Sequence, residues 1–95
     1  MTLDDRLRRV RLLVCDVDGV LTDGAVYYGA SGEELKRFHV RDGSALKLWR
    51  LAGNEAALVS GRASPATARR AAELGVPHCL QGRDDKAAAL RELLA

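Results

Sequence analysis

The sequence predicts an α/β fold built on a parallel sheet, because short apolar runs alternate with segments of helical spacing. The run LLVCDV is apolar except for Asp16, which is typical of a strand buried on both faces. EAALVS repeats that pattern, and PHCL is a shorter third example. We expect these runs to pair through right-handed crossovers. The predicted strands are Leu12–Val17, Glu55–Val59 and His78–Leu80.

A β-hairpin is expected between the first strand and the first long helix. The β-prone segments AVYY and ELKRFHV flank the Gly/Ser turn GASGE. The sequence therefore predicts Val26–Tyr28 pairing with Leu35–His39. A ribbon of two strands is marginal in water by itself, so we expect the hairpin to contact other copies of the chain.

The first two predicted helices differ in character. TLDDRLRRVR has the charge of a short surface helix. The second helix begins at Asp42 or Ser44 and ends at Gly53, with Trp49 on its core face. Asp42 is open to two interpretations, a helix cap or a site residue.

The last two helices carry clear start signals. Ser64 followed by Pro65 predicts a helix that Gly75 ends. Asp84 or Asp85 can cap a final helix from Lys86, which has a leucine stripe. The chain stops at RELLA while still helical, so we expect it to be the N-terminal part of a longer domain.

Composition limits the function classes. A hydrophobic fraction of 47% and a charged fraction of 29% exclude a disordered chain. The net charge of +2 is scattered, which argues against nucleic-acid binding. No apolar run reaches membrane-spanning length, and no export signal opens the chain. Cys15 and Cys79 lie in apolar stretches without a CxxC neighbour, so reduced cysteines and a cytoplasmic location are expected.

Reactive side chains follow each predicted strand. Asp16 ends the first strand and Asp18 follows two residues later; Ser60 and Arg62 follow the second, and Lys86 follows the third. Ligands of open parallel sheets bind beyond the carboxyl ends of the strands. We therefore expect these groups to meet at one rim, which explains why acids follow a buried run.

Such a set permits phosphoryl transfer through an aspartyl phosphate. Asp16 is the candidate nucleophile, helped by Mg²⁺ because two anions repel. Lys86 and Ser60 are candidates to stabilise the phosphoryl oxygens, and Asp18 is the candidate acid and then base.

The residues also carry a family resemblance. DVDGVLTD, from Asp16 to Asp23, resembles the first motif of the haloacid-dehalogenase-like phosphatases, VSGR the second, and Lys86 the third. GEELKRFHVRDG and LVSGRASP resemble the 3-deoxy-D-manno-octulosonate-8-phosphate phosphatases of lipopolysaccharide sugar biosynthesis. The resemblance implies a Rossmann-like three-layer parallel sheet with an inserted β-hairpin. It also implies Mg²⁺-dependent hydrolysis of that acidic sugar phosphate or a similar one.

The resemblance assigns roles residue by residue. Asp16 and Asp18 would be metal ligands, Asp18 through its backbone carbonyl, and Asp16, Asp18 and Lys86 would be catalytic. It also implies a homotetramer built through the hairpin. The implied substrate-binding residues are Asp18, His39, Val40, Arg41, Asp42, Gly43, Ser60, Gly61, Arg62, Arg70, His78 and Lys86.

Some alternatives stay open. Taken alone, Lys86 and Arg70 are also typical of solvated helix residues, and His78 of a structural residue. The family's fourth motif, an acidic pair, has no match after Lys86. We therefore expect one haloacid-dehalogenase-like domain over residues 1–95, its N-terminal part, with the hairpin at about 25–40, and weak Mg²⁺ binding.

Two other function classes fit part of the pattern. One is a non-catalytic module that oligomerises or binds phosphate, which the absent fourth motif favours. The other is a phosphoacceptor signalling domain, which the DxDG spacing and the hairpin argue against.

Overall fold

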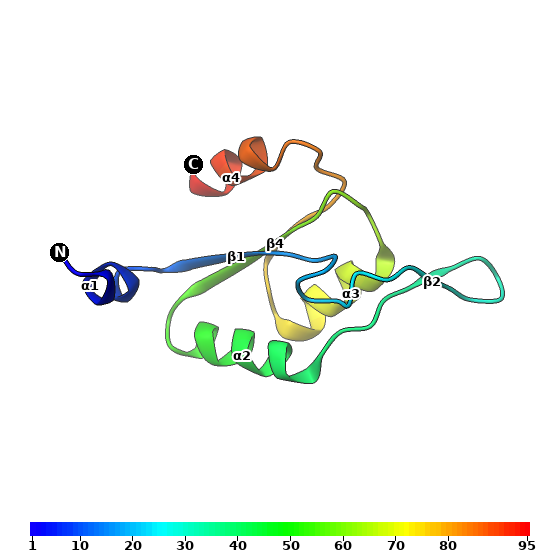
Figure 1. The fold of residues 1–95 in the computed structure, drawn as a ribbon, viewed down its shortest axis with the longest axis horizontal. Helices are drawn as coiled ribbons and strands as arrows, with labels where there is room; N and C mark the ends of the chain where they lie inside the picture. The colour runs from blue at the N-terminus through cyan, green and yellow to red at the C-terminus, as the bar shows by residue number, and fades with distance from the viewer.

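Three parallel strands form the centre of the chain, in the spatial order β1-β4-β5 (Figure 1). The computed structural model describes residues 1–95. The strands of this sheet are β1 Leu12–Asp16, β4 Glu55–Val59 and β5 His78–Leu80. The predicted α/β architecture with a parallel three-stranded sheet is confirmed.

Helices cover both faces of the sheet. Figure 1 shows α2 and α3 on one side and α4 on the other, while α1 stands at the end of the chain away from the sheet. The sheet is therefore the middle of three layers. None of the helices combines the length and the apolar character that a membrane span requires. The helices are α1 Leu3–Arg8, α2 Val40–Leu51, α3 Pro65–Leu74 and α4 Lys86–Leu94.

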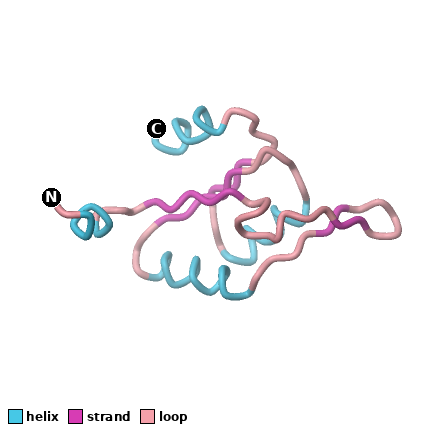
Figure 2. Tube along the Cα trace, viewed as in Figure 1, coloured by secondary structure: helices cyan, strands magenta, loops and turns pink.

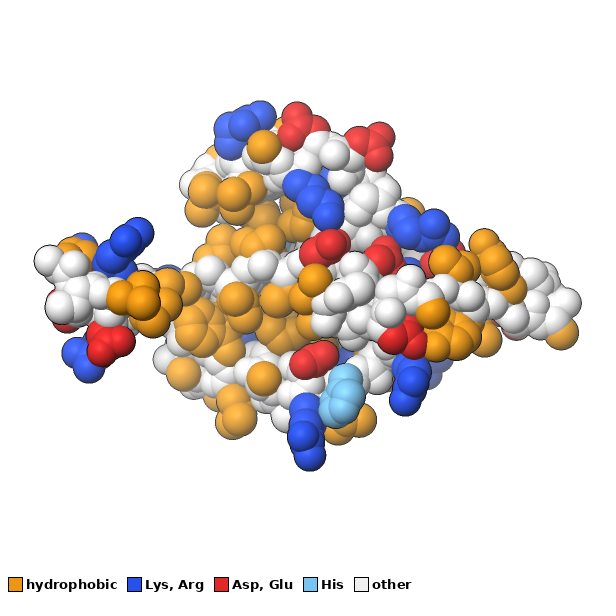
Figure 3. Space-filling view, in the orientation of Figure 1, with side chains coloured by type: hydrophobic (Ala, Val, Ile, Leu, Met, Phe, Trp, Pro, Cys, Tyr) orange, Lys and Arg blue, Asp and Glu red, His pale blue; other side chains and the backbone are white.

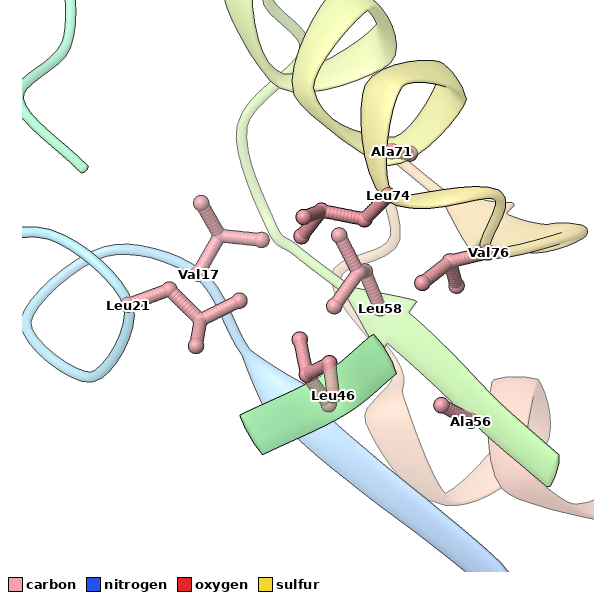
Figure 4. Packing of buried hydrophobic residues seen from close by; sticks show 8 residues of the cluster. All are labelled: Val17, Leu21, Leu46, Ala56, Leu58, Ala71, Leu74 and Val76. Atoms are coloured by element: carbon pink, nitrogen blue, oxygen red, sulfur yellow. The ribbon is translucent and has the colours of Figure 1, made fainter. Parts of the chain in front are cut away.

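The core is small and centres on β4. Residues 56–59 of this strand are all buried because strands pair with it on both edges and helices cover both faces of the sheet. Only 16 of 95 residues are buried, so each core side chain carries a large share of the packing. Figure 4 shows the main cluster, formed by Val17, Leu21, Leu46, Ala56, Leu58, Ala71, Leu74 and Val76.

Strand β1 lies at an edge of the sheet and pairs only with β4. Leu13 of β1 is 40% exposed. Figure 3 shows apolar side chains across the middle of this face, between α4 and α2. A cavity of about 190 Å³ lies here, lined by Val14, Asp16, Val59, Lys86 and Leu90.

Strand β1 ends at Asp16, one residue earlier than predicted. The carbonyl of Val17 accepts hydrogen bonds from the amides of Leu21 and Thr22, at 3.0 and 3.2 Å. These bonds turn the chain away from the sheet. Asp16 is therefore the last strand residue, and Asp18 lies in the loop.

The hairpin is shorter than predicted. Strands β2, Tyr27–Tyr28, and β3, Glu34–Leu35, pair in antiparallel fashion, and Figure 2 shows them projecting from the body of the chain. Val26 and residues 36–39 lie outside the ribbon, although Phe38 bridges to Thr22. The predicted strand Leu35–His39 is wrong at its end because His39 caps α2.

Helix α2 begins at Val40, before the predicted Asp42 or Ser44. The Nδ1 atom of His39 accepts a hydrogen bond from the Arg41 amide at 3.0 Å, which satisfies a donor that a helix start leaves free. The interpretation of Asp42 as the cap is therefore wrong, and Asp42 lies in the first turn.

The other helix boundaries follow the sequence signals. The side chain of Ser64 caps α3, and Gly75 ends it with φ of 67°. Of the two predicted caps of α4, Asp85 is the one observed, accepting from the Ala88 amide at 3.0 Å. Trp49 packs against the core as predicted.

We predict that Leu58→Ala severely destabilises the fold. Leu58 is 1% exposed at the centre of the core, and truncating such a side chain costs about 2–5 kcal/mol. Urea denaturation followed by circular dichroism would measure the loss. The matched control is Leu51→Ala, because Leu51 is 83% exposed, and its change should stay within about 0.5 kcal/mol. Equal losses for both variants would contradict the assigned core.

Candidate active site

The strand register sets the position of the site. Asp16 of β1 pairs with Val59 of β4, and Val59 pairs with Leu80 of β5. The carboxyl ends of the three strands are therefore level. The loops that follow them carry Asp18, Ser60 and the start of α4 to a common rim.

Asp16 meets Lys86 at this rim. The Lys86 Nζ atom lies 3.2 Å from Asp16 Oδ2, while Asp16 Oδ1 accepts a hydrogen bond from the Val17 amide at 2.8 Å. The Asp16 side chain is 37% exposed and the Lys86 side chain is 52% exposed. This carboxylate is held in place and remains open to a ligand from solvent.

Asp18 makes a second, more buried ion pair. Its Oδ1 atom lies 2.5 Å from Lys36 Nζ, and its Oδ2 atom accepts a hydrogen bond from Ser60 Oγ at 3.5 Å. The structure thus brings Asp16, Asp18, Ser60 and Lys86 to one rim, as the sequence predicted. Lys36 was not predicted.

Lys36 belongs to a chain of charges that starts at the hairpin. Its Nζ atom is also 2.9 Å from Glu34 Oε1, and Glu34 Oε2 lies 2.8 Å from Arg62 Nη2. The Lys36 side chain is only 4% exposed. Glu34 and Lys36 were not predicted from the sequence, although their spacing of two residues in a strand-like segment places them on one face.

The ion pairs shift the pKa values of their members. Burial lowers the pKa of Lys36, but its hydrogen bonds to Asp18 and Glu34 together outweigh burial and leave the pKa raised. The hydrogen bonds of Glu34 to Arg62 and then to Lys36 lower the pKa of Glu34 below its ordinary value of 4.5. Both residues are therefore held in their charged forms.

The loop after β4 is fixed by its own hydrogen bonds. The Ser60 side chain accepts from the Arg62 amide at 3.2 Å, and the Ser60 amide donates to the Leu80 carbonyl at 2.8 Å. Ser60 is 2% exposed, whereas the Arg62 side chain is 51% exposed. Gly61, between them, is exposed. The loop is therefore rigid at Ser60 and presents Arg62 to solvent.

The predicted substrate turn, His39–Gly43, starts α2, where Val40 is 77% exposed. Arg70 of α3 packs against this turn: its Nη2 atom lies 3.5 Å from the His39 carbonyl oxygen, and its guanidinium stacks over Phe38. Arg70 is therefore not a solvated helix arginine. It makes no hydrogen bond or ion pair with Asp16 or Asp18.

Gly43 and Arg41 of this turn differ in burial, and His78 lies elsewhere in the fold. Gly43 is buried, and a Cβ there would lie 2.9 Å from Leu74 Cδ2, so only glycine fits without movement. Arg41 is exposed. His78 starts β5, two residues before the rim, and the structure does not bring it to the other site residues.

The chain has no group of three or more His, Cys, Asp or Glu side chains that could hold a metal ion. The rim does offer the Asp16 carboxylate and the oxygens of Asp18. Oxygen donors of this kind suit Mg²⁺, which keeps several waters in its shell. The donor chemistry therefore fits Mg²⁺, with few protein ligands.

Several known proteins are similar to this chain in sequence and in fold. The 3-deoxy-D-manno-octulosonate 8-phosphate phosphatase of Yersinia pestis is 45% identical over 95 residues, covering 97% of this chain and 51% of that protein. The crystal structure of this enzyme from Yersinia pestis superposes with a TM-score of 0.91 and 44% identity, over 95% of this chain and 49% of that one. This chain is a homologue of these phosphatases.

Two further structures extend the match. The phosphatase of Moraxella catarrhalis, in complex with a magnesium ion, a phosphate ion and KDO, is 39% identical with a TM-score of 0.87, over 97% of this chain and 55% of that one. A Legionella pneumophila protein is described as a hydrolase of the HAD (haloacid-dehalogenase-like) superfamily. It is 38% identical with a TM-score of 0.89, over 94% of this chain and 49% of that one.

These matches confirm the resemblance and the haloacid-dehalogenase-like fold. The chain spans about half the length of the curated relatives it matches. No family model matches the chain.

We predict that Glu34→Gln makes stability less sensitive to acid. Because the pKa of Glu34 is lowered in the folded state, its contribution is present above the unfolded value of 4.5 and is lost as pH falls through the folded pKa. Urea midpoints measured from about pH 6 to about pH 3 should therefore fall less steeply in this variant than in the wild type.

The matched control is Glu33→Gln, since Glu33 is exposed and forms no ion pair. Its acid profile should follow that of the wild type. A Glu34→Gln profile parallel to that of the wild type would contradict the assigned ion pairs.

Proposed function

We propose that the chain supplies the nucleophile and the acid/base group of a Mg²⁺-dependent phosphatase. Its substrate is 3-deoxy-D-manno-octulosonate 8-phosphate or a similar acidic sugar phosphate, and the reaction serves lipopolysaccharide sugar biosynthesis. One observation supports this proposal most directly. Asp16, Asp18, Ser60 and Lys86 lie together at the carboxyl ends of β1 and β4. The homologous phosphatases support this assignment.

Asp16 is the proposed nucleophile. Its carboxylate oxygen forms a bond to phosphorus while the bond from phosphorus to the sugar oxygen breaks. Asp18 enters this step in its protonated form and gives that proton to the departing sugar alkoxide. Water then attacks the phosphorus of the aspartyl phosphate, Asp18 takes the proton of that water, and inorganic phosphate and the Asp16 carboxylate are released.

Lys86 and Ser60 are the proposed phosphoryl-binding residues. The Lys86 ammonium lies 3.2 Å from Asp16 and is half exposed, so it can follow the phosphoryl oxygens as negative charge accumulates there. The Ser60 hydroxyl is buried at the same rim, and it is a neutral donor that would exchange its long bond to Asp18 Oδ2, 3.5 Å, for one to a phosphoryl oxygen.

Asp16 and the backbone carbonyl of Asp18 are the residues that would hold Mg²⁺. When bound, the ion reduces the repulsion between the phosphate and the Asp16 carboxylate. Because the chain contributes few acidic ligands, water and phosphate oxygens would fill most of the coordination shell.

Substrate recognition is assigned to the turn that begins α2 and to the loop after β4. Arg62 is exposed and cationic, which suits the carboxylate of an acidic sugar. Arg70 contributes by packing against the turn. The proposed contacts are His39, Val40, Arg41, Asp42, Gly43, Ser60, Gly61 and Arg62.

We further propose that residues 1–95 belong to one haloacid-dehalogenase-like domain in the cytoplasm. Cys15 and Cys79 are both free thiols, which is typical of a reducing compartment. The hairpin is the proposed contact between copies of the chain. Its exposed apolar side chains are Tyr27 at 38%, Tyr28 at 69% and Leu35 at 49%, and Val26, just before β2, is 50% exposed.

We predict that Asp16→Asn abolishes phosphate release. The measurement is inorganic phosphate liberated from 3-deoxy-D-manno-octulosonate 8-phosphate at saturating Mg²⁺. An amide cannot act as the nucleophile, so release should fall to the level seen without protein. Asp4→Asn, a change at an exposed acid of α1, should retain wild-type release. Turnover by Asp16→Asn equal to that of the wild type would remove the nucleophile assignment.

We predict that Tyr28→Glu weakens self-association. A charge on the exposed ribbon opposes burial against another copy. Sedimentation equilibrium should show oligomers for the wild type and a shift to monomers for the variant. Leu48→Glu, a change at an exposed position of α2, is the control. A wild-type chain that stays monomeric at high concentration would argue against the hairpin contact.

A further inference from the structure

Lys36 is a buried lysine with two anionic partners. It directly follows the residues of β3, and its side chain is 4% exposed. Asp18 and Glu34 lie 2.5 and 2.9 Å from its Nζ atom. A buried ammonium is strongly unfavourable without such partners, so this position has a specific electrostatic role.

The two lysines of the site divide the two acids between them. Lys86 pairs with Asp16 in an exposed arrangement, where its long side chain is free to move toward a ligand. Lys36 pairs with Asp18 in a buried arrangement, where it has no such freedom. The two pairs therefore have different tasks.

Both carboxylate oxygens of Asp18 have partners. Lys36 is paired with Oδ1, and Ser60 Oγ lies 3.5 Å from Oδ2. Two contacts on opposite oxygens restrict rotation of the carboxylate about its own bond. Lys36 itself is fixed by Glu34, which Arg62 holds from the other side at 2.8 Å.

We propose that Lys36 is a positioning residue that orients the Asp18 carboxylate for proton transfer. Glu34 supports it from the base of the hairpin, so the hairpin and the acid/base group are mechanically linked. This inference rests on the proposed function of Asp18. It adds a residue that acts through Asp18 and does not touch the substrate.

The first test observes the ion pair without reference to activity. In ¹H–¹⁵N spectra of lysine ammonium groups, the Lys36 signal should be protected from exchange with water. The protection should be lost in Asp18→Asn. Lys47, which is exposed and forms no ion pair, provides the unprotected reference signal. An unprotected Lys36 signal in the wild type would overturn the inference, whatever the activity of the chain.

The second test measures proton transfer. A sugar alkoxide needs a proton to leave, whereas a nitrophenolate leaves with little help. Single-turnover rates are compared for 3-deoxy-D-manno-octulosonate 8-phosphate and p-nitrophenyl phosphate. Lys36→Met should slow the sugar phosphate at least roughly tenfold more than the aryl phosphate, because general acid catalysis contributes about 10²–10⁴-fold. Lys47→Met should leave the ratio of the two rates unchanged.

Glu34→Gln is a second variant that tests the same proposal if Lys36→Met does not fold. It keeps the Lys36 side chain and its pair with Asp18 but removes one of its two anionic partners, so it should change the ratio of the two rates in the same direction by a smaller factor. Equal slowing of both substrates by Lys36→Met and an unchanged ratio in Glu34→Gln would overturn the inference. A wild-type chain that dephosphorylates neither substrate would instead count against the proposed function, and the Lys36 signal would still decide the ion pair.

Discussion

The parallel pairing of β1 with β4 is the constraint on which the site depends. The register aligns Asp16 with Val59, so the first polar residue of β1 and the loop after β4 reach the same edge of the sheet. The apolar residues before them are needed for the core, since β4 is almost completely buried. A carboxylate within that run would lose its hydration, whereas at the strand end it keeps solvent on one side. Packing and chemistry thus require the same position for Asp16.

Charge balance is the second constraint. Two carboxylates near one another repel, and each becomes stable by pairing with its own lysine. The buried pair of Asp18 with Lys36 is the more demanding, because desolvation opposes the charged form of the lysine. Glu34 compensates by adding a second anion, and Arg62 balances Glu34. The network therefore extends from the rim to the hairpin, and the hairpin is part of the site.

Elements with strong local signals could be predicted from the sequence. Continuous apolar runs marked β1, β4 and β5, and the Ser64 cap with Gly75 marked α3. The start of α2 could not be predicted, because a histidine cap is less characteristic than the aspartate three residues later. The rim of Asp16, Asp18, Ser60 and Lys86 followed from strand order. Lys36 did not, because a lone lysine in a hairpin is normally exposed, and only contacts distant in sequence show its burial.

Side chains at residues 34–36 alternate between the two sides of the hairpin, so the two sides have different roles. Leu35 is 49% exposed, whereas the side chains of its neighbours Glu34 and Lys36 are 19% and 4% exposed and face the site. A ribbon of two residue pairs has little rigidity of its own. Its base is held by ion pairs to Asp18 and Arg62, and its outer side is free to contact another copy. Because both sides belong to consecutive residues, a contact that displaces Leu35 also displaces Lys36, and with it the carboxylate of Asp18.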